Sequence, residues 1–177
     1  MTMRPMKQIM AFDRRNAALH EAGHVVTAWH RGIHAEAMIK SETDGGEVLF
    51  NKTWTGQTRL GTWQQLGAAD RLHIAVAGEI AVMRGRGDDL ESVLDTMTWG
   101  EATGMSPSDW QLAGYQAGNV DRRFMPAVER VYKLLDREWP TVCGVARDLI
   151  FKARITQTFQ MTECRIVSSN DHVVGND

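Results

Sequence analysis

The chain has 177 residues, of which 43% are hydrophobic and 24% are charged, a composition that predicts one globular domain with a hydrophobic core. The net charge of −2 gives no reason to expect a nucleic-acid partner, and no apolar run is long enough to predict a membrane span or a signal peptide. Two cysteines, Cys143 and Cys164, are too few for a disulfide scaffold, so we expect a cytoplasmic protein in which both are small, buried or half-buried side chains.

The first predicted element is a helix over residues 14–31, with Asp13 as its N-cap and Gly32 placed to end it. Residues 34–52 then predict two short strands joined by a turn at 44–46. The second strand, residues 46–50, has two interpretations. It is either an ordinary buried hairpin strand or an edge strand to which an extended peptide adds.

The next element is a long helix over residues 63–85. Thr62 and Gln65 fit the capping-box pattern at its start, and Gly85 and Gly87 mark its end. The segment that follows, residues 88–105, is expected to be a loop with room for one short helix.

A second helix start is marked by Ser106 as N-cap, Pro107 at the first helical position and Asp109 at the third. Apolar residues at helical spacing predict a further helix over 122–139, which stops before a proline. That proline begins a last amphipathic helix over 140–154.

Together these elements predict a mainly α fold of the α+β class, with a small sheet or hairpin beside the first helix. We expect one domain over residues 1–166 and a flexible tail over 167–177. Besides Trp29 of the first helix, five tryptophans are scattered along the chain, which favours core or cleft positions over a stacking platform for nucleic acid. They are Trp54, Trp63, Trp99, Trp110 and Trp139.

The motif that carries chemistry lies in the first helix, where His20, Glu21 and His24 form His-Glu-x-x-His. Residues four apart lie on one helical face, so both imidazoles can point at a single ion. Zinc in such a site acidifies water, and Glu21 takes the proton as the water attacks a peptide carbonyl. Gly23 costs a helix about 1 kcal/mol relative to alanine, which indicates that another segment passes close by. The motif therefore predicts a zinc site with Glu21 as general base.

The third ligand is less directly predicted, because catalytic zinc takes three protein ligands and leaves one position to water. His30 would complete a metzincin pattern, but this chain has Thr27 where that pattern has glycine. With Thr27 the helix should continue and carry His30 about 15 Å along the axis from His20, out of reach of the ion. Several carboxylates are candidates instead, namely Asp109, Glu79, Glu91 and Asp95. Asp109 also fits a simple capping role at the start of its helix.

Residues 20–24, His-Glu-Ala-Gly-His, resemble the protease domain of the FtsH-type zinc metallopeptidases. In that family the third ligand is an aspartate near the start of a later helix, after Thr-Gly-Ala-Ser-Asn. Residues 103–109 read Thr-Gly-Met-Ser-Pro-Ser-Asp, and residues 74–82 resemble the family's Gly-Gly-Arg-Ala-Ala-Glu helix, with Val82 in place of its glutamate. The likeness covers about residues 14–166. It implies that Asp109 is the third zinc ligand.

FtsH-type proteases are membrane-anchored hexamers in which an ATPase module feeds unfolded substrate to the protease domain. This chain has no Gly-Lys pair, which a P-loop requires. The resemblance therefore implies a stand-alone, ATP-independent zinc metalloendopeptidase for peptides or unfolded proteins, and self-association as a homo-oligomer. Extra residues between Gly78 and Asp109 suggest a loop that covers the cleft. The alternatives are a catalytically silent peptide-binding or regulatory domain, and a metzincin-like protease that uses His30.

Overall fold

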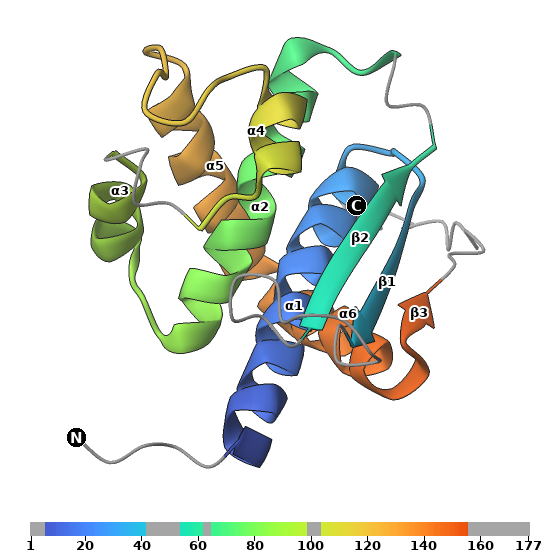
Figure 1. The fold of residues 1–177 in the computed structure, drawn as a ribbon. Coiled ribbons are helices and arrows are strands. Elements are labelled where there is room, and N and C mark those ends of the chain that lie inside the picture. The colour runs from blue at the N-terminus through green and yellow to red at the C-terminus, as the bar shows by residue number, and fades with distance from the viewer. Residues whose placement is uncertain (1–5, 42–53, 62–64, 99–103, 156–177) are drawn as a thin grey trace, which may run out of the picture.

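The computed structural model describes residues 6–41, 54–61, 65–98 and 104–155. These residues form six helices and three strands (Figure 1). In chain order they are α1 (Met6–His30), β1 (Ala35–Ser41), β2 (Trp54–Leu60), α2 (Ala68–Arg86), α3 (Leu90–Thr98), α4 (Pro107–Ala113), α5 (Phe124–Arg137), α6 (Trp139–Lys152) and β3 (Arg154–Ile155). The predicted class, mainly helical with a small sheet beside the first helix, is confirmed.

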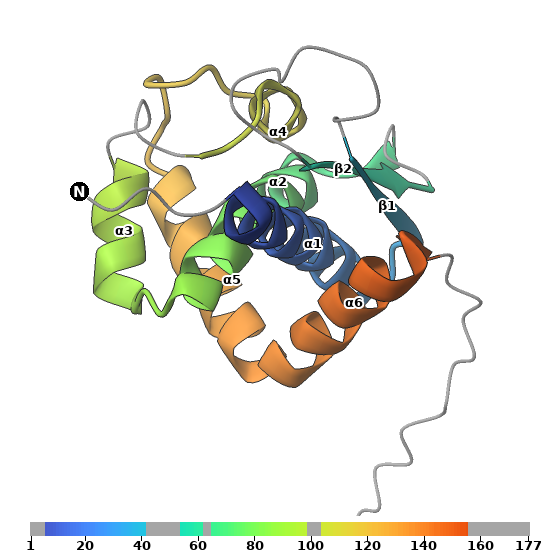
Figure 2. The ribbon, with the colours of Figure 1, turned by 60° about the horizontal axis from the view of Figure 1, so that its bottom comes forward.

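Helix α1 is the central element, and Figure 2 shows it almost end-on, surrounded by the others. It packs against α2 and α6, and also against the strands β1 and β2. The close approach expected at Gly23 is confirmed, because a Cβ added there would meet the backbone oxygen of Ala77 and would lie 2.8 Å from the Cβ of Ala81. A glycine that weakens the isolated helix thus lets α1 and α2 touch.

The predicted start of α1 is wrong, and its predicted end is confirmed. The helix begins at Met6, so Asp13 lies inside it. Residues 6–13 contain no proline or glycine, and a single aspartate costs too little helix propensity to stop a helix. At the other end Gly32 has φ 71°, and the N–H of Ile33 donates to the carbonyl of Ala28 at 2.9 Å.

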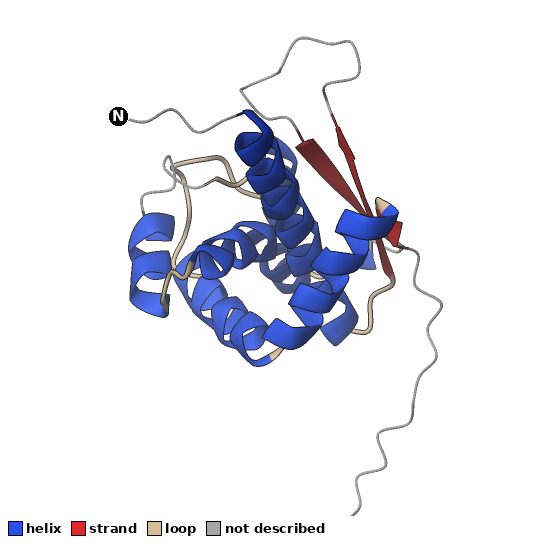
Figure 3. Ribbon diagram, turned by 90° about the horizontal axis from the view of Figure 1, so that it is seen from below, coloured by secondary structure: helices blue, strands red, loops and turns tan. Residues whose placement is uncertain are grey.

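The sheet is antiparallel, with the order β2-β1-β3, and its strands lie together on one flank of the helices (Figure 3). Ala35 pairs with Leu60 and Ser41 with Trp54 across β1 and β2. The partner of β1 is therefore β2, which the sequence pattern did not predict. The predicted strand at 46–50 and its turn at 44–46 lie outside the described residues.

Helix α2 begins later than predicted and ends where expected. Its N-cap is Gly67, so Gln65 precedes the helix, and Thr62 lies outside the described residues. Gly87, at φ 101°, caps the C-terminus by donating its N–H toward the carbonyls of Arg84 and Met83. Left-handed backbone of this kind is easiest for glycine.

The later helices confirm the sequence pattern. Trp110 of α4 stacks on Phe124 of α5 with ring centroids 5.7 Å apart, which ties the short helix to the bundle. Trp54 and Trp139 pack against the core, whereas Trp63 and Trp99 lie outside the described residues. Cys143 is exposed, so the expectation that it is buried or half-buried is wrong, because other residues form the buried face of α6, namely Val142, Val145, Ala146 and Leu149. Cys164 lies outside the described residues. In the part of the chain that is described, we find no helix with the length and hydropathy that a membrane span requires.

Candidate metal centre

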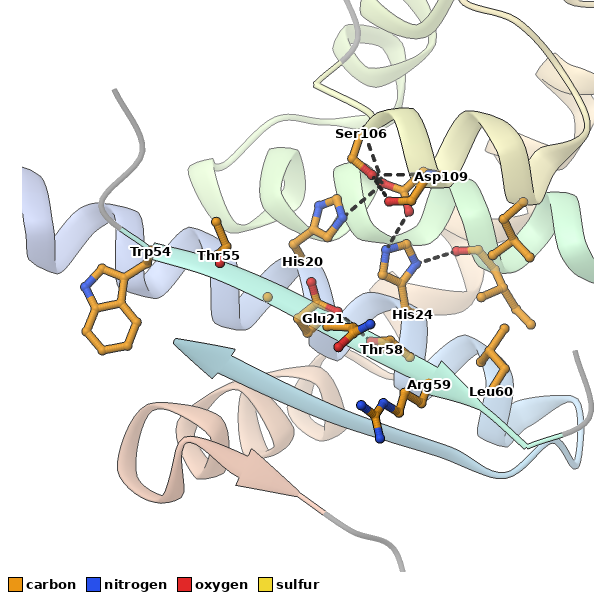
Figure 4. Close-up of a pocket in the computed structure, with 15 residues that line it drawn as sticks. His20, Glu21, His24, Trp54, Thr55, Thr58, Arg59, Leu60, Ser106 and Asp109 are labelled. Atoms are coloured by element: carbon orange, nitrogen blue, oxygen red, sulfur yellow. Dashed lines mark hydrogen bonds and ion pairs between the residues drawn. The ribbon is translucent and has the colours of Figure 1, made fainter. Parts of the chain in front are cut away.

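Two histidines of α1 and one aspartate of α4 converge in space (Figure 4). The Nε2 atom of His20 lies 3.2 Å from Oδ2 of Asp109, and Nε2 of His24 lies 3.3 Å from Oδ1. The ligand atoms of these three residues all lie within 4.8 Å of one another. Within the described residues they are the group of histidine, cysteine and acidic side chains that could hold a metal ion.

The donor set fits zinc. Tetrahedral zinc with bonds of about 2.0–2.1 Å places neighbouring ligand atoms about 3.3 Å apart, and each imidazole nitrogen lies at about that distance from one of the two oxygens of Asp109. Two nitrogens and one carboxylate oxygen are also the ligand types of catalytic zinc sites, which keep a fourth position open. His20, His24 and Asp109 are thus suited to hold zinc with a position free for water.

Gly78 of α2 makes room for the two imidazoles. A Cβ added at this position would lie 2.6 Å from Nε2 of both His20 and His24. Any other residue would therefore push a side chain into the space where the nitrogen lone pairs meet. Sequence reasoning used Gly78 only as part of a family likeness and did not predict this steric role.

The orientation of His24 is set by a second contact. Its Nδ1 donates to the backbone carbonyl of Ile74 at 2.7 Å, and the side chain is only 6% exposed. A proton held on Nδ1 leaves Nε2 to face Asp109 and the candidate metal position. Nothing in the local sequence predicts this contact, because Ile74 is 50 residues away.

Asp109 is held by the start of its own helix. Its N–H donates to Oγ of Ser106 at 3.2 Å, while the N–H of Ser106 donates to Oδ2 of Asp109 at 3.1 Å. The hydroxyl of Ser106 also donates to Oδ2 at 2.8 Å. The predicted cap is confirmed, and capping and approach to the histidines are compatible roles of one side chain.

The electrostatics of the group follow from this geometry. Burial alone would lower the pKa of His24, but the carboxylate of Asp109, and beyond it Glu21, raises that pKa to about 9. Burial would raise the pKa of Asp109, but the charge of His24 and hydrogen bonds from both histidines hold it far below its usual range. In the metal-free protein a protonated His24 therefore pairs with an ionised Asp109, and zinc would take the place of that proton.

Glu21 lies beside this group and under β2. The hydroxyl of Thr58 donates to Oε2 of Glu21 at 2.6 Å. A Cβ added at Gly56 would lie 2.7 Å from Cδ of Glu21, so the strand passes directly over the carboxylate. Glu21 is 5% exposed and thus firmly positioned. The sequence predicted the glutamate but neither of its partners on β2.

A pocket of about 610 Å³ opens above the group. Its size is in the range of small-molecule and peptide side-chain sites. The described lining comes from α1, β2, α2 and α4, namely His20, Glu21, His24, Trp54, Thr55, Gly56, Gln57, Thr58, Arg59, Leu60, Ile74, Ser106, Ser108, Asp109 and Leu112.

The other candidate ligands lie outside the group. Helix α1 continues through Thr27, and His30 is its exposed last residue. Glu91 and Asp95 are exposed on α3. Glu79 is buried next to Gly78 but does not belong to the set of converging ligand atoms.

The segment expected to cover the cleft is described in part. Residues 90–98 form α3, which packs against α5 and α2 and contributes no residue to the pocket lining. Residues 99–103 lie outside the described ranges, so the expectation of a covering loop is not supported by α3.

No model of a known protein family matches the chain, and no curated protein matches its sequence. The geometry of the candidate metal centre is therefore the main indication of function. The motifs at residues 20–24 and 103–109 add the resemblance to the FtsH-type metallopeptidases.

Proposed function

We propose that the protein is a zinc-dependent metalloendopeptidase that hydrolyses peptide bonds without ATP. The observation that carries the proposal is the convergence of His20, His24 and Asp109 at the floor of an open pocket, with Glu21 beside them. Three ligands with an adjacent glutamate are typical of catalytic zinc, whereas structural zinc takes four ligands and needs no base.

Each side chain has a distinct role in this proposal. Zinc held by His20, His24 and Asp109 would supply Lewis acidity, lowering the pKa of a water and polarising the substrate carbonyl. Glu21 takes a proton from the attacking water and returns it to the nitrogen of the departing amine. Thr58 orients the carboxylate of Glu21 by donating a hydrogen bond to one oxygen, which leaves the other for the water.

Among the described strands β2 lies at the edge of the sheet, and this edge supports an extended peptide as substrate. Gly61 donates its N–H to the carbonyl of His34, and antiparallel pairs alternate between bonded and non-bonded residues. By this alternation, the backbone N–H and C=O groups of Gly56 and Thr58 point away from β1. A peptide that pairs with them runs over Glu21. The pairing requires extended backbone, which favours peptides and unfolded segments as substrates.

The test is cleavage of a quenched peptide library by the zinc-loaded protein without ATP. We expect cleavage that a chelator abolishes and added zinc restores. Glu21→Gln should reduce kcat/KM by about 10²–10⁴-fold, the usual contribution of a general base, without changing the zinc content. Glu91→Gln removes the same charge from exposed α3 and should leave activity unchanged.

Two results would contradict the proposal. A protein that binds zinc and peptides but cuts nothing would be the catalytically silent domain. If His30→Ala loses zinc while Asp109→Ala keeps it, the site would be metzincin-like. The proposed ligand set predicts the reverse.

A further inference from the structure

Glu79 is a buried carboxylate that the proposed mechanism does not use. It follows Gly78 on α2 and is 8% exposed, and its side chain has no hydrogen-bond or ion-pair partner among the described residues. Its carboxylate packs against Gly104, where an added Cβ would lie 2.6 Å from Oε1. A carboxylate that lines a pocket and has no partner among the described residues is available to a cationic group of a ligand.

The carboxylate lines a second pocket of about 450 Å³, which we call the Glu79 pocket. This pocket shares His20, Glu21, Trp54 and Ser106 with the pocket above the metal centre. A group bound in it therefore lies next to the reacting atoms.

The charges of the Glu79 pocket favour a cation. Among the described residues, its lining contains three carboxylates, those of Asp13, Glu21 and Glu79, and one guanidinium, that of Arg86. Arg86 is exposed in the last turn of α2, two turns beyond Glu79, and the two form no ion pair. The described residues hold no second group of three metal ligands, so a cationic side chain fits better than a second metal ion.

We propose that the Glu79 pocket is a substrate subsite that takes a lysine or arginine side chain next to the scissile bond. The inference rests on the proposed peptidase function. An ammonium or guanidinium group donates charge-assisted hydrogen bonds to a carboxylate, and no described residue competes for that of Glu79. On the other side of the metal centre, Leu60, Ile74 and Leu112 line the first pocket and favour an apolar side chain. The preferred substrate thus has a basic residue on one side of the cleaved bond and an apolar residue on the other.

The test uses zinc-loaded protein and matched peptides with lysine or glutamine at each position around the cleaved bond. We expect one position at which lysine raises kcat/KM about 10-fold or more over glutamine, as for a hydrogen bond to a charged group. Glu79→Gln should abolish that ratio, because it slows cleavage of the lysine peptide far more than cleavage of the glutamine peptide. Glu79→Asp, which keeps the charge, should retain a preference for lysine, and Glu91→Gln should retain it in full.

The outcomes separate this inference from the proposed function. Cleavage without a lysine preference, or a preference that survives Glu79→Gln, overturns the subsite and leaves the peptidase. An equal loss for both peptides in Glu79→Gln assigns Glu79 a structural role and also overturns the subsite. Equilibrium binding of the same labelled peptides to zinc-loaded Glu21→Gln gives a readout independent of turnover. A lysine preference in binding without wild-type cleavage supports the subsite and overturns the peptidase, whereas equal or absent binding overturns the subsite.

Discussion

At the scale of single residues, the candidate metal centre depends on the absence of a side chain at Gly78 as much as on the nitrogen ligands of the two histidines. The metal-facing nitrogens of His20 and His24 lie where a side chain at residue 78 would begin. Glycine is poor for the stability of a helix interior, and here its position is explained by the space that the imidazoles need.

Gly78→Ala should therefore displace the imidazoles and weaken zinc binding by about 100-fold or more, the upper range for disturbing the support of metal ligands. Gly144→Ala in α6 is the matched control, because its added Cβ meets no atom within 4 Å. Both alanines should increase helix propensity by about 1 kcal/mol. Zinc per chain, measured after dialysis at fixed free zinc, distinguishes the two variants. Wild-type zinc binding by Gly78→Ala would contradict the steric role.

The pair of His24 and Asp109 predicts a pH dependence for the metal-free protein. The pKa of His24 is about 9 in the folded chain and 6.5 ordinarily, so the stabilisation is full below pH 6.5 and is lost as pH rises through about 9. The pKa of Asp109 is lowered, so its contribution is present above pH 3.8 and is lost as pH falls toward the folded-state pKa.

Between pH 6.5 and pH 9, the Tm of the metal-free protein should thus fall by several degrees. Thermal unfolding followed by circular dichroism in the presence of a chelator measures the change. Asp109→Asn should flatten this dependence, because it removes the charge that raises the pKa of His24. His30→Ala, which alters an exposed histidine outside the pair, should retain it.

At the scale of elements, short α4 carries the ligand that comes from furthest along the chain. Its capping box holds Asp109 through Ser106, so the start of the helix and the position of the carboxylate are one structural feature. The strand β2 likewise holds the carboxylate of Glu21 in position, through the hydrogen bond from Thr58.

Ser106→Ala should lower the stability by about 1 kcal/mol through loss of the cap. It should also weaken zinc binding by about 10-fold, because Asp109 loses a hydrogen bond that orients it. Ser108→Ala is the control, since Ser108 bonds only to the hydroxyl of Ser106. Denaturant unfolding and zinc titration report the two effects separately. Equal zinc affinity in both variants would show that the cap does not position the ligand.

The edge of β2 predicts a dependence on the backbone of the substrate. A peptide methylated on a backbone nitrogen next to the cleaved bond loses one donor for the carbonyl of Gly56 or Thr58. We expect kcat/KM to fall about 10-fold relative to the unmethylated peptide, the cost of losing one backbone hydrogen bond. Methylation at a distant position is the control and should have little effect. Equal cleavage of both peptides would exclude pairing with β2.

At the scale of the whole molecule, the candidate ligands join segments that are far apart in sequence. His20 and Asp109 are 89 residues apart, and α1 and α4 both pack against α2. A metal ion that binds the folded chain but not the unfolded chain stabilises the folded state by mass action.

Zinc at 100 times its dissociation constant should add about 2.7 kcal/mol, which corresponds to a Tm rise of about 5–10 °C for a chain of this size. A chelator should reverse the rise, as measured by scanning calorimetry. Asp109→Asn should show a much smaller rise at the same zinc concentration. If its rise equals that of the wild type, Asp109 is not a ligand.

The features that depend on local backbone geometry could be predicted from the sequence. His20 and His24 share a face because the helical repeat is the same in any context, and Ser106 caps the helix of Asp109 because the pattern spans only four residues. The helix ends at Gly32 and Gly87 follow from the left-handed backbone that glycine adopts easily.

Only the tertiary structure decided which distant groups meet. β2 is a polar strand with an internal glycine, and its pairing with β1 rather than its own pattern makes it a strand. The approach of Asp109 to the histidines and the space at Gly78 depend on how α2 packs between α1 and α4. The physical reason is that hydrogen-bonded repeats are local, whereas packing brings together side chains whose separation in sequence carries no information about their distance in space.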